Sequence, residues 1–167
     1  SGLWRDSYGS PKAHDSSVRG VITDSLNQLT TTGGSDCRIK FWRFKNKGDS
    51  PLSVITLEEP ISFFRSHQES SMVAAALEDF DIYVIDIETR RVVRKFVGHT
   101  GQITDMTFSP DSRWLISASM DCTIRTWDIP SCQLVDQFAT EVACVSLNLS
   151  PTGEALATAH VDYLGIF

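Results

Sequence analysis

Two sets of residues in this chain combine the side chains of a hydrolytic triad with a tryptophan. The sets are His14, Thr32, Asp36 and Trp42, and then His99, Ser117, Asp121 and Trp127. In both, the aspartate follows the histidine by 22 residues and the tryptophan follows the aspartate by 6. A histidine between an aspartate and a hydroxyl could activate a nucleophile. The recurring tryptophan instead favours a buried chain of hydrogen bonds, which stabilises a fold only when every member is paired. We therefore expect both sets, called tetrads below, to be structural, and we predict no catalytic residue.

The elements that position the second tetrad lie between Gly98 and Asp128. Three short apolar runs, at 103–108, 115–116 and 124–127, are separated by turns at 109–112 and 120–121. Runs this short, bounded by Pro, Gly, Asp and Ser, predict antiparallel strands joined by tight turns. The opening Gly98-His99 and the closing Trp127-Asp128 resemble the signature of a WD repeat, the unit of a β-propeller blade.

The repeat recurs along the whole chain. The position of the tetrad histidine falls at residues 14, 57, 99 and 140, which are 43, 42 and 41 residues apart. This period predicts an all-β WD40 propeller fold, comprising about four blades of a larger, seven- or eight-bladed propeller. We expect WD repeats at 14–56 and 99–139, a degenerate WD repeat at 57–98, and a truncated repeat at 140–167 that stops inside a strand. Residues 1–13 are expected to form the outer strand of a preceding blade.

Two of the repeats have lost tetrad members. In the degenerate repeat, the His, Ser and Trp positions hold Leu57, Ala75 and Ile85, and only Asp79 remains. Apolar packing can replace such a network at little cost when all partners are lost together. In the last repeat the His, Ser and Asp positions hold Thr140, Thr158 and Asp162.

A four-blade arc would present an uncovered sheet face at each end, so we expect it to self-associate through its open edges. Three arrangements would cover those faces. Further blades of a larger protein could complete the ring, or two copies could close into eight blades. A strand near residues 3–8 could also complete the fourth blade and close a small four-blade ring, which we consider the weakest of the three.

Composition narrows the class of protein. The chain has 167 residues, 41% of them hydrophobic, and a formal net charge of −6. An acidic chain lacks the basic stripe that a sequence-independent grip on nucleic acid needs. The cysteines form no Cys-x-x-Cys pair, so we expect reduced thiols, no metal and no cofactor. No apolar run or signal region predicts membrane insertion or secretion.

The densest basic stretch of the sequence is Arg90, Arg91, Arg94 and Lys95. It lies on a predicted strand and is expected to be a solvated edge, which also discourages aggregation between strands.

Several sequence segments outside the tetrads support a closer resemblance to one family of propellers. They lie at residues 14–20 (HDSSVRG), 39–47 (IKFWRFKNK), 86–91 (DIETRR), 101–110 (GQITDMTFSP), 120–128 (MDCTIRTWD) and 156–165 (LATAHVDYLG). Together they resemble the family of WD repeat-containing protein 36, also called U3 small nucleolar RNA-associated protein 21. The similarity includes repeats that have lost the common signature, which a generic propeller would not match.

The resemblance implies a function. It implies a non-catalytic scaffold of the nucleolus, in the nucleus, that helps assemble the U3 snoRNP and the small-subunit processome for pre-18S rRNA processing. Its partners would be other propeller and helical subunits of that particle, with U3 RNA and pre-ribosomal RNA contacted indirectly. The chain would belong to the second of two propellers.

Two other classes of function remain open. A propeller can also be a peptide-binding adaptor, such as a ubiquitin-ligase substrate receptor or a chromatin module. A basic or aromatic pocket at the channel mouth would favour the adaptor, whereas contacts spread over several blades would favour the scaffold. An enzyme is the third class, but the sequence has no Gly-x-Ser-x-Gly elbow, phosphate loop or His-Glu-x-x-His motif. Neither His67, in a predicted loop, nor His160, near a strand end, has a partner motif.

Candidate partner-facing residues follow from the propeller geometry alone. Residues beside the tetrad His and Asp reach the face on which propellers of this class commonly bind partners, and an ordinary solvated loop is an equally good interpretation. These residues are Ser17, Arg19, Ser35, Gln102, Thr104 and Met120.

Overall fold

The computed structural model describes residues 13–23, 29–43, 50–67, 70–160 and 164–166. Within these ranges the chain forms four antiparallel sheets, each a meander of consecutive strands. Sheet 1 contains β1 (Val18–Thr23), β2 (Leu29–Gly34), β3 (Arg38–Arg43) and β4 (Ser53–Thr56). Sheet 2 contains β5 (Ile61–Ser66), β6 (Met72–Leu77), β7 (Ile82–Asp86) and β8 (Arg91–Phe96). Sheet 3 contains β9 (Ile103–Phe108), β10 (Trp114–Ser119), β11 (Thr123–Asp128) and β12 (Gln133–Ala139). Sheet 4 contains β13 (Cys144–Leu149), β14 (Leu156–His160) and β15 (Leu164–Ile166). The all-β prediction is confirmed.

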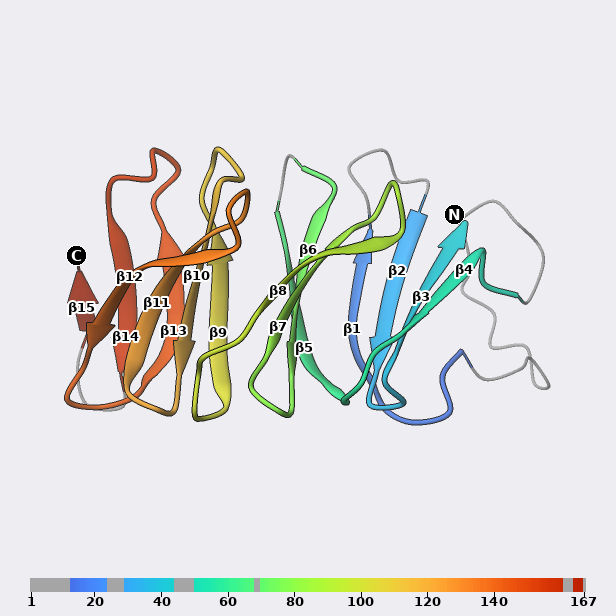
Figure 1. The fold of residues 1–167 in the computed structure, drawn as a ribbon, viewed down its shortest axis with the longest axis horizontal. Coiled ribbons are helices and arrows are strands. Elements are labelled where there is room, and N and C mark those ends of the chain that lie inside the picture. Colours follow the sequence, from blue (N-terminus) through green and yellow to red (C-terminus); the bar gives the residue numbers. More distant parts are fainter. Residues whose placement is uncertain (1–12, 24–28, 44–49, 68–69, 161–163, 167) are drawn as a thin grey trace, which may run out of the picture.

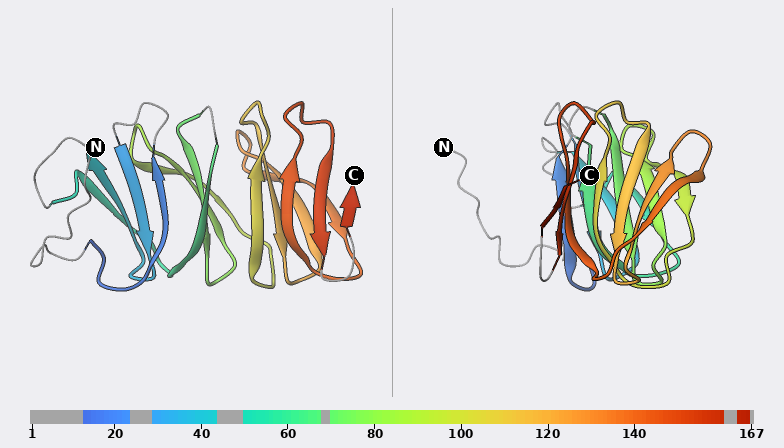
Figure 2. Two further views of the ribbon diagram at one scale, coloured as in Figure 1. Left: turned by 180° about the vertical axis from the view of Figure 1, so that it is seen from behind. Right: turned by 90° about the vertical axis from the view of Figure 1, so that its left-hand side faces the viewer.

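The four sheets stand side by side in chain order, with sheet 1 and sheet 4 at opposite ends (Figure 1). Strands β1, β5, β9 and β13 each begin a sheet, and β5 packs on β1 while β13 packs on β9. The left-hand view of Figure 2 shows the same open row from behind, with the long axis crossing all four sheets. The small four-blade ring is therefore wrong for the described residues, because its first and last sheets would have to meet.

Two faces of this row are used below. The tetrad face is where strands β1, β5, β9 and β13 begin and where the β2–β3, β6–β7 and β10–β11 turns lie, at the lower edge of Figure 1. The opposite face carries the connections that follow strands β5, β9 and β13.

Each pair of neighbouring sheets encloses its own apolar layer. Strand β6 shows why the run from Met72 to Leu77 is apolar without interruption. Val73, Ala75 and Leu77 pack toward sheet 1, whereas Ala74 and Ala76 pack toward sheet 3. Because successive side chains of a strand point to opposite faces, a strand buried on both faces needs apolar residues at every position.

A close backbone approach holds sheet 1 against sheet 2. The ring of Phe64 on β5 fills the space beside Gly33 on β2, where an added Cβ would lie 1.9 Å from Phe64 Cε2. No residue larger than glycine fits at position 33 unless this ring moves.

The turns on the tetrad face repeat one geometry. The residue after the aspartate has a positive φ in all three described turns, 60° at Cys37, 73° at Phe80 and 61° at Cys122. The aspartate carboxylate accepts the backbone N–H two residues on, as Asp121 does from Thr123 at 2.9 Å. Asp side chains favour such local bonds, so they define the turn.

The expected strands agree closely with the observed ones. The expected run at 103–108 matches β9, and those at 115–116 and 124–127 lie within β10 and β11. Each sheet lies within one expected repeat, and the division into repeats remains a prediction. The strand expected in residues 1–13 falls almost wholly outside the described residues, as does Asp162. No described segment is a helix long and apolar enough to cross a membrane.

Candidate functional site

The third repeat brings its four tetrad residues into one hydrogen-bonded chain. His99 Nδ1 lies 2.9 Å from Asp121 Oδ2, and His99 Nε2 lies 2.8 Å from Ser117 Oγ. The indole N–H of Trp127 donates to the same Ser117 oxygen at 2.8 Å. The serine is fully buried, and Trp127 packs against Phe96 of sheet 2 with ring centroids 5.2 Å apart.

The first repeat forms the same chain at nearly the same distances. His14 Nδ1 lies 2.9 Å from Asp36 Oδ1, and His14 Nε2 lies 2.8 Å from Thr32 Oγ1. Trp42 donates to that hydroxyl at 2.8 Å. The tetrad residues project from the face of their sheet that looks toward the preceding sheet. Trp42 is therefore only partly buried, because no described sheet covers it.

The electrostatics of the third tetrad favour a neutral histidine and an ionised aspartate. Burial lowers the pKa of His99, against the opposing attraction of Asp121. Burial alone would raise the pKa of Asp121, but hydrogen bonds from Thr123, Thr100 and His99 together hold it well below its usual range. Both ring nitrogens of His99 are bonded and Ser117 is inaccessible, so this geometry offers no route for a substrate. We infer that the tetrads are structural.

The degenerate repeat replaces the tetrad with apolar contacts. Leu57, Ala75 and Ile85 are all buried in the layer between sheets 1 and 2. Asp79 is exposed, and among the described residues its carboxylate accepts only the N–H of Asp81, at 3.1 Å, within its own turn.

The basic stretch on β8 is not a solvated edge throughout. Arg90 and Arg91 are exposed, but Arg94 donates to the carbonyls of Ile129 at 2.5 Å and Pro130 at 3.0 Å in sheet 3. Lys95 pairs with Asp81 at 3.0 Å and Glu58 at 3.3 Å. Bonds to Tyr83 and then Asp81 raise the pKa of Lys95. The expectation is wrong for Arg94, because the turn after β11 supplies its partners. Lys95 is exposed as expected, but it is paired with the β6–β7 turn of its own sheet and with the linker before β5.

Asp105 on β9 joins three sheets, which the repeat pattern did not predict. Its buried carboxylate accepts from Arg65 Nε of sheet 2 at 2.9 Å and from the Ser146 hydroxyl and Leu147 N–H of sheet 4, each at 2.9 Å. The signal that could have revealed it is an aspartate inside the apolar run 103–108, where an unpaired charge would be costly.

The two unassigned histidines also have structural partners. His160 is buried at the end of β14, with Nδ1 2.9 Å from the Val142 carbonyl and Nε2 3.0 Å from Thr158 Oγ1. In the last repeat it therefore contacts the hydroxyl at the Ser position of the tetrad. His67 follows β5 and lies 3.1 Å from the Ser109 carbonyl of sheet 3.

The candidate partner-facing residues divide into two groups. Ser17, Arg19, Gln102 and Met120 are exposed on the tetrad face and Ser35 is partly buried there. The Thr104 hydroxyl instead donates to the Cys144 carbonyl at 2.5 Å, a hydrogen bond between sheets 3 and 4. The exposed members remain candidates.

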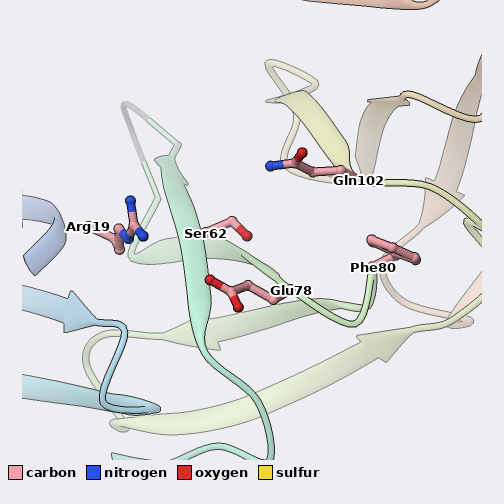
Figure 3. A pocket seen from close by; sticks show the side chains of 5 residues that line it. All are labelled: Arg19, Ser62, Glu78, Phe80 and Gln102. Atoms are coloured by element: carbon pink, nitrogen blue, oxygen red, sulfur yellow. The ribbon is translucent and has the colours of Figure 1, made fainter. Parts of the chain in front are cut away.

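A hollow of about 310 Å³ lies on the tetrad face. Its lining residues come from three sheets and are Arg19, Ser62, Glu78, Phe80 and Gln102. Arg19 stands on one side, Phe80 and Gln102 on the other, and Ser62 and Glu78 lie between (Figure 3). A larger hollow of about 520 Å³ opens on the opposite face, where Phe108, Pro110 and Pro151 contribute to its lining.

The tetrad face near sheet 2 carries an excess of carboxylates. Glu59, Glu78 and Asp79 are exposed and make no ion pair within the described part of the chain. Burial, and then the nearby carboxylates of Glu59, Asp36 and Glu78, raise the pKa of the Cys37 thiol. All four cysteines are free thiols. Across the described ranges, no three His, Cys, Asp or Glu side chains lie close enough to hold a metal ion.

The antiparallel sheets stand in a row, three with four strands and the last with three described strands, and two of them carry a His–Ser/Thr–Asp–Trp chain. Together they define a partial WD40 β-propeller. A solved structure has the same architecture, the WD40 β-propeller domain of Doa1. It superposes with a TM-score of 0.74 over 93% of this chain and 51% of that chain, at 18% sequence identity.

Sequence comparison then defines the family. The WDR36/Utp21 second β-propeller domain matches residues 1–167. Human WD repeat-containing protein 36 is 53% identical over 167 residues, which are 100% of this chain and 18% of that protein. The U3 small nucleolar RNA-associated protein 21 homolog of Schizosaccharomyces pombe is 40% identical over 166 residues, or 99% of this chain and 18% of that protein. The chain belongs to the WDR36/Utp21 family and corresponds to its second propeller. It spans less than a fifth of the length of these relatives.

Proposed function

We propose that this chain is part of a non-catalytic scaffold for ribosome biogenesis, which helps assemble the U3 snoRNP and the small-subunit processome for pre-18S rRNA processing. The observation that carries the proposal is the 40% identity, over 99% of the chain, to a protein named for its association with U3 small nucleolar RNA. The identity extends through repeats that have lost the WD signature.

The geometry supports a scaffold over an enzyme. In both His–Asp pairs each ring nitrogen of the histidine is hydrogen-bonded, and the pair in the third repeat is enclosed between sheets 2 and 3, so these residues organise the blades. The surface left for function is then a protein-binding surface. The net charge of −6 fits contacts with protein subunits, with U3 RNA and pre-ribosomal RNA held indirectly, in the nucleolus.

A peptide-binding adaptor is the second candidate, because one specific observation favours it. The hollow on the tetrad face contains both an aromatic side chain, Phe80, and a basic one, Arg19. Such a hollow is what a ubiquitin-ligase receptor or a chromatin module would use to read a short segment.

The two candidates differ in what co-purifies with the full-length protein. The protein is tagged in its own cells and purified gently, the bound RNA is sequenced, and the bound proteins are identified. A WD40 protein from an unrelated pathway, tagged in the same way, is the control. We expect enrichment of U3 and pre-ribosomal RNA together with other propeller and helical subunits. Ubiquitin-ligase or chromatin subunits without that RNA would refute the scaffold and favour the adaptor.

A further inference from the structure

The hollow on the tetrad face is formed by side chains whose backbone is firmly held. The N–H of Glu78 donates to the Pro60 carbonyl at 2.9 Å, and the N–H of Phe80 donates to the Leu77 carbonyl at 3.2 Å. The carbonyl of Gln102 accepts the N–H of Met120 at 2.9 Å. The backbone around the hollow is therefore preorganised, which reduces the entropy lost when a ligand binds.

Phe80 is the most unusual part of this lining. Its φ of 73° places a bulky aromatic residue in the left-handed region, where glycine or asparagine is the ordinary choice. The chain tolerates this conformation in the β6–β7 turn, and Phe80 lines the hollow on the side opposite Arg19, with Glu78 between them (Figure 3). A hollow lined by both an aromatic ring and a carboxylate can attract an organic cation.

The charges around the hollow decide which sign of ligand it prefers. Arg19 is the one cation among the described residues that line it, and its Nε donates to the Ser35 hydroxyl at 2.9 Å. Glu78 lines the hollow, and Glu59 and Asp79 belong to the same part of the tetrad face, each without an ion pair among the described residues. Three carboxylates against one guanidinium leave a local excess of negative charge, so a positive group gains more here than a negative one.

We propose that this hollow binds a lysine or arginine side chain from an extended segment of a partner protein. The cationic group pairs with the Glu78 carboxylate in the middle of the hollow, and the Phe80 ring bounds the hollow on the side opposite Arg19. Arg19 and the Gln102 amide bind the carbonyl oxygens of the segment on either side, because a guanidinium and an amide N–H both donate. The inference rests on the proposed function in one respect, since the partner is a protein that this scaffold assembles.

The size of the hollow agrees with this occupant. A volume of about 310 Å³ is at the small end of the range for ligand pockets, about 300–1,000 Å³, and suits one long side chain with its flanking peptide groups. Its lining joins sheets 1, 2 and 3, so a bound segment would also bridge the blades that the scaffold has to keep together.

The test uses the purified full-length protein and labelled seven-residue peptides, Gly-Ser-Gly-Xaa-Gly-Ser-Gly, followed by fluorescence anisotropy. The central residue is arginine, lysine, citrulline or glutamate. We expect saturable binding of the arginine and lysine peptides and about tenfold weaker binding of the citrulline peptide, because citrulline keeps the shape of arginine without its charge. Equal binding of the citrulline peptide, preference for the glutamate peptide or no saturable binding at all would each overturn the proposal.

Two variants locate the binding in the hollow. Glu78→Gln should weaken the arginine peptide about tenfold and leave the citrulline peptide unchanged, and Phe80→Leu should weaken it severalfold. Glu154→Gln is the matched control, because that exposed glutamate precedes β14 on the opposite face. Unchanged affinity in Glu78→Gln would refute the assignment. Because the Glu78 side chain is exposed and makes no ion pair in the described chain, this variant should fold normally.

The outcome is separable from that of the proposed function. If the wild-type protein co-purifies U3 RNA but binds no arginine peptide, only the assignment of the hollow fails. If it binds the peptide but carries no U3 RNA, the scaffold function fails and the hollow stands.

Discussion

Removal of the Asp121 carboxylate tests the structural role of the tetrads most directly. In the folded chain this carboxylate accepts from His99 Nδ1 at 2.9 Å, Thr100 N at 3.0 Å, and Thr123 N at 2.9 Å. It also accepts from the Thr123 hydroxyl at 2.6 Å. The side chain is 7% exposed and that of His99 is 1% exposed, so water cannot readily replace the carboxylate beside the ring.

The expected cost follows from these contacts. In Asp121→Ala the buried His99 Nδ1–H loses its acceptor at 2.9 Å and is left with the Thr123 hydroxyl at 3.4 Å, which costs about 1–3 kcal/mol. The bonds to Thr100 and Thr123 lie nearer to solvent and add a smaller amount each. We expect a total of about 3 kcal/mol of lost stability in sheet 3. Asp79→Ala should cost less than about 0.5 kcal/mol, because Asp79 is exposed and, among the described residues, accepts only one backbone bond.

Hydrogen exchange of the full-length protein, followed by mass spectrometry, measures the loss of stability separately for each segment of the chain. The opening free energy of segments in β10 and β11 should fall in Asp121→Ala, so that their amides exchange roughly 150-fold faster. Segments in β6 and β7 should exchange less than about twofold faster in Asp79→Ala. Equal acceleration in the two variants would refute the assignment of the tetrad in the third repeat. Asp121→Asn is a useful intermediate, since its amide oxygen can still accept from His99.

Three further outcomes follow from the structure. Gly33→Ala should destabilise the contact between sheets 1 and 2 by about 1–3 kcal/mol, because its Cβ would overlap Phe64; Phe64→Leu in the same chain should recover part of the loss in thermal unfolding. Asp105→Ala should cost about 2–4 kcal/mol, because the buried N–H groups of Leu147 and Met106 lose their acceptor and the half-exposed Arg65 loses its partner. Asp136→Ala on the exposed strand β12 should change the unfolding midpoint little. As the pH is lowered, sheet 3 should lose stability at a higher pH than sheet 2. Hydrogen-exchange rates of the two sheets, corrected for the intrinsic effect of pH on exchange, measure this. The pKa of His99 is depressed in the fold, so its contribution is present above about pH 6.5 and is lost as the pH falls through the folded pKa. Equal loss of protection in both sheets would contradict this.

Much of the candidate site follows from features within one repeat. A histidine 22 residues before an aspartate and a tryptophan 6 residues after it meet in one sheet, because strand register and tight turns determine which side chains lie side by side. This is why the contacts of His99, Ser117 and Trp127 could be anticipated from spacing. The apolar replacement of a tetrad at Leu57, Ala75 and Ile85 follows the same logic.

Contacts between repeats could not be anticipated in this way. Arg65 and Asp105 are 40 residues apart, and nothing in either repeat alone indicates that they meet. The same is true of Arg94. Its own repeat predicts a solvated side chain, whereas in the structure it donates to the carbonyls of Ile129 and Pro130 in the next repeat. Whether a charged side chain is paired depends on the relative position of two sheets, which no local pattern encodes.

The sequence by itself therefore determined the propeller class, the strands and the internal geometry of each blade, because these rest on a repeated period and on bonds within one sheet. Only the tertiary structure decided how the blades are joined and where a ligand could enter. The Asp105 link and the hollow between Arg19, Glu78 and Phe80 each draw residues from three sheets. Such sites arise where sheets pack at their ends, and packing is a property of the assembled blades.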